Sequence, residues 1–99
     1  MYDIYATDTF KELYDSIEKH EKIWIDKIKE KLKEFPTGKP LGYPWFKEKK
    51  YHDKRLYFLI DEERKKVLLV SFSSKKEQQE IIDFVKADMH ELFTYLKEL

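Results

Sequence analysis

Cationic side chains able to bind an anion recur at alternate positions in the middle of the chain. Lys47 and Lys49 stand two residues apart, and Arg55 opens the next apolar run. Because side chains of a strand alternate between the two faces of a sheet, Lys47 and Lys49 share one face. Unpaired lysines cannot line a dry core, so we expect this pair to join Arg55 on the open face. Lys75 and Lys76, after the following β-prone run, bring two more cations there.

A cluster of this kind suits phosphate. Lysine and arginine supply charge, arginine also supplies a planar fork of donors, and an aromatic ring can stack on a base. Tyr57 alternates with Arg55, which places its ring on the same predicted face. The alternative is that paired lysines on an edge strand only prevent edge-to-edge aggregation. His52, in a predicted hairpin turn, either titrates near a phosphate or is a solvated turn residue.

The charges of the 99-residue chain are balanced but segregated. Twenty basic residues offset twenty acidic ones, so no overall positive charge indicates nucleic-acid binding. Residues 36–76 hold eleven basic and five acidic side chains, whereas 1–35 and 77–99 are net acidic. The basic middle of the chain is therefore where we expect an anionic partner to bind.

Several classes of protein are excluded by composition. There is no cysteine, which rules out disulfides, thiolate metal sites and cysteine nucleophiles. No apolar run approaches the roughly 18 residues of a membrane span, and the N-terminus lacks a signal-peptide pattern. Glycine-rich phosphate loops, metal-ligand spacings and Ser-His-Asp arrangements are also missing. We expect a soluble cytoplasmic protein that needs no metal or cofactor.

The hydrophobic pattern changes period along the chain. Residues 2–6 alternate as a short strand, and two amphipathic helices that meet near residue 20 follow, ending before Pro36. Pro and Gly make 36–42 a loop, after which period two indicates a three-stranded antiparallel meander. The strands of this meander are expected at 45–51, 55–60 and 67–72. With a last helix over 75–99, the order β-α-α-β-β-β-α predicts one α+β domain spanning 1–99, with helices on one sheet face.

The last predicted helix carries an apolar stripe at steps of three and four residues. Two arrangements would bury it: a bend near 87–88 that docks the whole helix, or a projecting distal half covered by a second copy or another protein. The second arrangement would make the helix a homodimer or partner interface. The stripe consists of Ile82, Val85, Met89, Leu92, Leu96 and Leu99.

Three segments in this order resemble the RelE/ParE toxin superfamily, especially the RelE-like toxins encoded by archaea. Trp45–Lys49 is similar to the basic strand of the family, Lys54–Ile60 to its arginine-hydrophobic-tyrosine strand and Val67–Phe72 to its buried β run. The likeness extends from Tyr2 to about Ile82. It implies the RelE fold and the toxin of a type II toxin–antitoxin system. Such a toxin is a ribosome-dependent mRNA endoribonuclease (mRNA interferase) that inhibits translation and is neutralised by a cognate antitoxin.

The resemblance also implies roles for individual residues. Lys47 and Lys49 match the lysine pair of the family, one of which activates the attacking 2′-hydroxyl or protonates the leaving oxygen. Arg55 matches the arginine that clamps the scissile phosphate, and Lys75 the basic residue after the last strand. Further RNA contacts are expected from Lys50, Tyr57 and Lys76.

One position departs from the family pattern. The tyrosine expected about six residues after the basic position is Ile81 here. Two alternatives therefore stand beside the nuclease: a ParE-like toxin that poisons a topoisomerase, and a catalytically inactive homologue that only binds RNA or protein.

Overall fold

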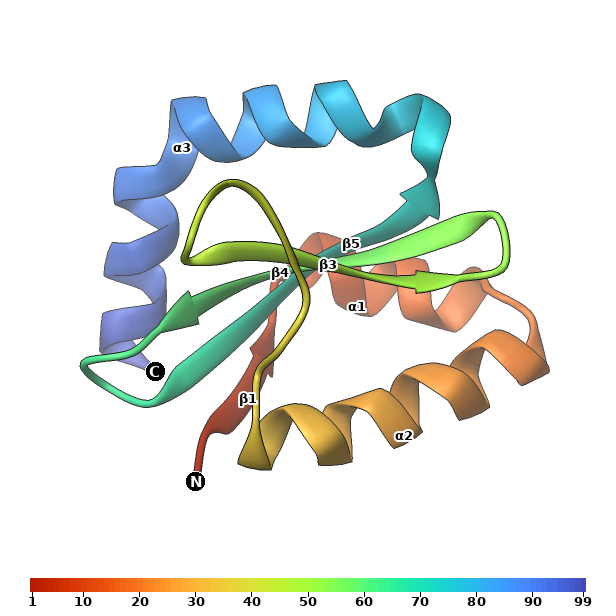
Figure 1. Cartoon of the computed structure of the whole chain (residues 1–99), viewed down its shortest axis with the longest axis horizontal. Coiled ribbons are helices and arrows are strands. Elements are labelled where there is room, and N and C mark those ends of the chain that lie inside the picture. The colour runs from red at the N-terminus through yellow and green to blue at the C-terminus, as the bar shows by residue number, and fades with distance from the viewer.

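A five-stranded sheet separates two layers of helices in the computed structural model, which describes residues 1–99 (Figure 1). The strands lie in the order β1-β5-β4-β3-β2, with β1 parallel to β5 and all other neighbours antiparallel. The elements are β1 (Asp3–Ala6), α1 (Asp8–Ser16), α2 (Lys19–Glu34), β2 (Lys39–Tyr43), β3 (Phe46–Tyr51), β4 (Lys54–Asp61), β5 (Lys66–Ser74), the short 3₁₀ helix η1 (Lys75–Glu77) and α3 (Gln78–Glu98).

The predicted α+β class is confirmed, but one strand was missed. Residues 39–43 form β2 and pair with β3, with Pro40 opposite Lys47, although residues 36–42 were expected to be a loop. The sequence did not indicate this strand because it contains Pro40 and Gly42, and both residue types are typical of turns. Proline is tolerated here because β2 is an edge strand, whose outward N–H groups need no partner in the sheet.

Apolar residues are buried on both faces of the sheet, not on one as expected. Leu56, Phe58 and Ile60 of β4 pack with α1 and α2 on one face. Tyr57 and Leu59 pack with α3 on the other. Burial from both sides explains why β4 and β5 are almost continuously apolar in sequence.

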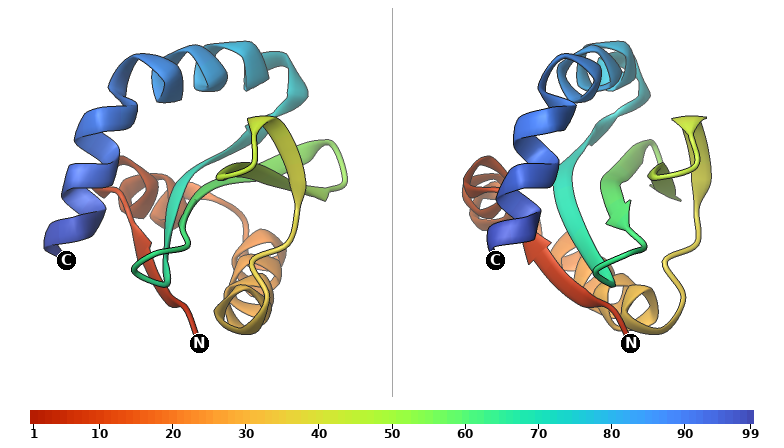
Figure 2. Two further views of the ribbon diagram at one scale, coloured as in Figure 1. Left: turned by 60° about the vertical axis from the view of Figure 1, so that its left-hand side comes forward. Right: turned by 90° about the vertical axis from the view of Figure 1, so that its left-hand side faces the viewer.

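The last helix docks on the sheet along its whole length. It bends about halfway, and its distal half turns down beside β1 (Figures 1 and 2). Val85, Leu92 and Leu96 are buried, and Lys66 Nζ of β5 donates to the Leu96 carbonyl at 3.0 Å. The docked arrangement of the two is therefore the one observed. None of the helices combines the length and the apolar character needed to cross a bilayer.

The β3–β4 hairpin is tied to the start of α2. Lys54 Nζ lies 2.7 Å from a carboxylate oxygen of Glu21, whose side chain is only 7% exposed, and the Tyr51 and Trp24 rings pack 4.7 Å apart. Burial by itself raises the pKa of the Glu21 carboxyl. The hydrogen bonds from Lys54 and from the Glu18 backbone outweigh this and hold the pKa below its ordinary value of 4.5.

We expect Glu21→Gln to lower the free energy of unfolding by about 1–3 kcal/mol at pH 7, because a charged hydrogen bond is lost in a buried position. A group whose pKa is lowered on folding stabilises the protein above its unfolded pKa and loses this contribution as the pH falls through the folded pKa. Urea unfolding at pH 7 and at pH 3 measures both effects. The difference from wild type should shrink at pH 3, and a difference that grows would contradict the assignment. Glu30→Gln, at an exposed pair with Lys33, is the control and should change stability by less than about 1 kcal/mol.

Leu96→Ala should cost about 2–5 kcal/mol, because it removes a fully buried side chain from the contact between α3 and the sheet. Met89→Ala, at a position on the same helix that is 41% exposed, should cost clearly less. Denaturant unfolding of both variants checks this, and equal losses would show that the distal half of α3 is not docked.

Candidate nucleic-acid interface

The pairing of β3 with β4 separates the two expected lysines from Arg55. Lys47 lies opposite Phe58 and Lys49 opposite Leu56, and both partners face α1 and α2. The predicted convergence of Lys47 and Lys49 with Arg55 on one face is therefore wrong. Both lysines are partly exposed, so their stems cross the margin of the core while the amines stay at its edge. Lys49 Nζ, for example, donates to Thr37 Oγ1 at 3.1 Å.

Glu48 and Lys50 lie beside Arg55 instead. The register places Lys50 directly opposite Arg55, and Glu48 opposite Tyr57 on the same face. Glu48 was not predicted as a site residue. The short turn that joins β3 to β4 was the signal that could have found it, because loop length fixes the register of a hairpin.

The β3–β4 turn lies on the same side of the molecule as the junction of β5 with α3 (Figure 1). Residues of this turn and of this junction line a polar hollow of about 340 Å³. No apolar residue lines it. Four cations meet there, all of them expected at the site from the sequence. The lining residues are Lys50, His52, Asp53, Arg55, Ser74, Lys75 and Lys76.

Arg55 is held from two sides. Its side chain is 12% exposed, with Nε 3.6 Å from Glu48 Oε2 and Nη1 donating to the Asp53 carbonyl at 3.4 Å. Gln78, in the first turn of α3, donates from Nε2 to the same Glu48 oxygen at 2.8 Å. The guanidinium is therefore fixed before any ligand binds.

Tyr57 faces the side of the sheet that carries Arg55, as predicted, but lies beneath α3 and is completely buried. Its ring is not available to stack on a base, so the expectation that it binds RNA in this way is wrong. Burial, and then the negative charge of Glu48, raise the pKa of its hydroxyl. That hydroxyl and Ser73 Oγ are buried without a hydrogen-bond partner.

Ile81, at the position where the family pattern has tyrosine, is partly buried and packs on the core between α3 and the sheet. It serves packing and brings no polar group to the hollow. The cations of the hollow can bind a phosphate. Glu48 does not line the hollow, but its carboxylate contacts Arg55, which does, and a carboxylate at that position can accept a proton.

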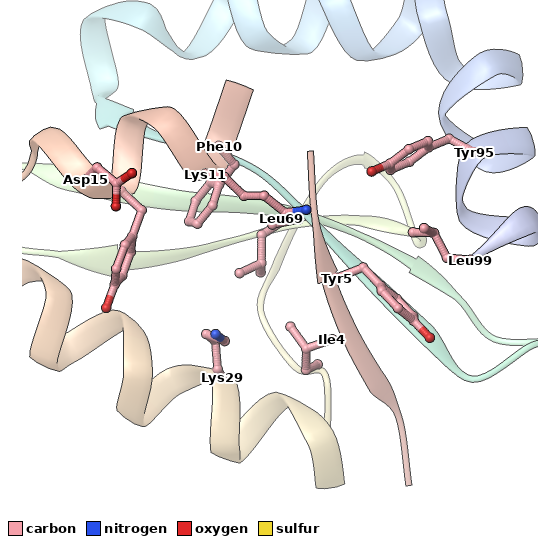
Figure 3. A pocket seen from close by; sticks show the side chains of 11 residues that line it. Ile4, Tyr5, Phe10, Lys11, Asp15, Lys29, Leu69, Tyr95 and Leu99 are labelled. Atoms are coloured by element: carbon pink, nitrogen blue, oxygen red, sulfur yellow. The ribbon is translucent and has the colours of Figure 1, made fainter. Parts of the chain in front are cut away.

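A larger hollow, of about 530 Å³, lies away from these cations beside β1 (Figure 3). Most of its lining residues are apolar, and they come from β1, α1, β5 and the end of α3, with Lys11, Asp15 and Lys29 at the α1 and α2 side. A mostly apolar lining suits the phosphate backbone of a nucleic acid less well than the cationic lining of the polar hollow does.

The fold is that of RelE toxins of known structure. A mutant of the E. coli RelE toxin in the free state superposes with a TM-score of 0.74 at 16% identity, covering 87% of this chain and 96% of that one. The RelBE toxin–antitoxin complex from Mycobacterium tuberculosis gives 0.62 at 18% identity, covering 75% and 98%. The archaeal RelE–RelB complex from Pyrococcus horikoshii gives 0.65 at 11% identity, covering 75% and 94%.

No family model and no curated protein matches the chain in sequence. At identities of 11–18% the likeness to the solved structures shows the fold alone. The resemblance drawn from the sequence is confirmed at that level.

Lys50→Ala and Lys75→Ala should each weaken binding of a labelled single-stranded RNA. Each should also reduce the slope of log K against log salt by about 0.7, the value for one lost phosphate contact. Fluorescence anisotropy at several salt concentrations measures both quantities. Lys47→Ala and Lys49→Ala are matched controls on the opposite face and should change neither. If only Lys47→Ala and Lys49→Ala weakened binding, the RNA interface would lie on the face of α1 and α2 instead.

Proposed function

We propose that this chain, as one toxin domain over residues 1–99, is the toxin of a type II toxin–antitoxin system that cleaves mRNA on the ribosome in the cytoplasm. Cleavage takes place at the polar hollow around Arg55. The observation that carries the proposal is the convergence of Lys50, Arg55, Lys75 and Lys76 in one hollow of a RelE fold.

The chemistry that suits this hollow is attack of a ribose 2′-hydroxyl on the adjacent phosphate. The transition state gathers negative charge on the phosphate oxygens, and donors fixed in advance toward such charge are usually the largest catalytic contribution. Arg55 fits this role because Glu48 and the Asp53 carbonyl already hold its guanidinium. Lys50 and Lys75 add charge at the wall of the same hollow.

Glu48 takes the role of proton acceptor, one of the two roles that the family resemblance implies for Lys47 or Lys49. Lys47 and Lys49 lie on the other face, whereas the Glu48 carboxylate lies beside the guanidinium that binds the phosphate. Its Oε2 is engaged by Arg55 and Gln78, and its Oε1 makes no hydrogen bond within the protein. An ionised carboxylate accepts a proton without the large pKa shift that a lysine base requires.

A cognate antitoxin is the expected protein partner. The RelE toxins from E. coli, M. tuberculosis and P. horikoshii that share this fold have been solved in complexes with RelB antitoxins. By analogy, we propose that an antitoxin neutralises this chain.

One observation favours a second candidate, an RNA-binding homologue that does not cut. Ile81 gives the hollow no hydroxyl where the family pattern has one. Such a protein would bind RNA through the same cations and leave mRNA intact.

Arg55→Lys should reduce mRNA cleavage by at least about a hundredfold, because it keeps the charge beside Glu48 but loses the planar fork of donors. Arg55→Ala is less informative, since removal of a mostly buried arginine leaves the Glu48 carboxylate without its partner. Induced expression followed by mapping of mRNA 5′ ends measures cleavage, and thermal melting confirms that the variant is folded.

Three results would count against the nuclease. If wild type produces no new 5′ ends but binds RNA, the non-cutting homologue is correct. If growth stops with intact mRNA and damaged DNA, the ParE-like alternative is correct. If Arg55→Lys cleaves as well as wild type, Arg55 has no part in the chemistry.

A further inference from the structure

His52 lies at the rim of the polar hollow in an uncommon backbone conformation. It is the first residue of the two-residue turn between β3 and β4, with φ of +54°, a region that few residues other than glycine occupy. Its side chain lines the hollow, and the Tyr51 ring packs edge-on against its imidazole at 4.4 Å. The turn therefore presents an imidazole to the cations.

Arg55 spans the distance between Glu48 and this turn. Nε of the guanidinium faces the Glu48 carboxylate, whereas Nη1 reaches the carbonyl of Asp53, the residue next to His52. His52 and Arg55 line the same hollow, so a phosphate bound there by Arg55 has the imidazole beside it. Cleavage by internal attack needs a proton donor near the leaving oxygen, which lies opposite the attacking oxygen across the phosphorus.

We propose that His52 is the proton donor to the leaving oxygen; this inference rests on the proposed function. The 2′-hydroxyl gives its proton to Glu48 as the bond from the 2′-oxygen to phosphorus forms. The bond from phosphorus to the 5′-oxygen breaks, and the His52 imidazolium protonates that oxygen. The products are a 2′,3′-cyclic phosphate and a 5′-hydroxyl, and one proton has moved from His52 to Glu48.

The charged groups that face His52 come from three elements: Lys50 of β3, Arg55 of β4, and Lys75 and Lys76 of η1, with Asp53 beside it in the turn. The cations stabilise the negative charge that develops on the leaving oxygen. Histidine is the side chain that most often serves as a general acid or base in enzymes.

Neither of the other histidines can take this role. His20 lies on α2, where its ring nitrogens contact the Glu18 carboxylate and the Tyr51 hydroxyl. His90 is exposed on α3 and does not line the hollow. His90→Asn is therefore a matched control.

The test compares wild type, His52→Asn and His90→Asn on ribosomes programmed with a short mRNA that wild type cuts. Asparagine tolerates positive φ, so His52→Asn keeps the turn, and thermal melting verifies this. A second mRNA carries sulfur in place of the 5′-oxygen at the mapped cleavage site. A thiolate leaves without protonation, so this substrate does not need a proton donor.

We expect His52→Asn to cleave the oxygen substrate about 10²- to 10⁴-fold more slowly than wild type, the usual contribution of a general acid. It should cleave the sulfur substrate within a few-fold of wild type, and His90→Asn should match wild type on both. If His52→Asn cleaves the oxygen substrate as fast as wild type, His52 is only a solvated turn residue. If the substitution slows cleavage of both substrates equally, His52 has a role other than proton donation. A wild type that cuts neither mRNA would overturn the proposed function itself, and this inference with it.

Discussion

The register of the β3–β4 hairpin decides what this protein can do. The two strands are joined by only two residues, His52 and Asp53, and this short turn sets every pair along them. It brings Lys50 opposite Arg55 and sends Lys49 to the face of α1 and α2. A slip by one residue would exchange the two faces of β3, and Glu48 would no longer lie beside Arg55.

The rest of the fold holds this hairpin from both sides of the sheet. On one face, the start of α2 binds it through the buried ion pair of Glu21 with Lys54. On the other face, Gln78 in the first turn of α3 binds Glu48, which in turn faces Arg55. The apolar core beneath α3 is therefore bordered by the polar contacts of Gln78, Glu48 and Arg55, and Arg55 lines the hollow. Folding and the geometry of the proposed site depend on the same contacts.

The fold was largely predictable because hydrophobic periodicity reports burial directly. The candidate site was less predictable from the sequence. Which residues meet there depends on how the residues of β3 pair with those of β4, and hydrophobic periodicity does not give this register. Arg55, Lys75 and Lys76 were placed together because each follows or begins a clear strand. Lys47 and Lys49 were expected on the face of Arg55 because unpaired lysines are costly in a core, but the register that the two-residue turn imposes places them on the other face. In fact lysine stems reach the edge of a core at modest cost.

A polar hollow that binds RNA requires the RNA to lie on the face of Arg55 and not on the face of Lys47 and Lys49. The most direct test is NMR titration of the ¹⁵N-labelled protein with a short 2′-O-methyl RNA, which lacks the attacking hydroxyl and stays intact. We expect the largest amide shifts in residues 50–55 and 73–76. Shifts centred on Lys47, Lys49 and the segment around Thr37 would contradict this expectation.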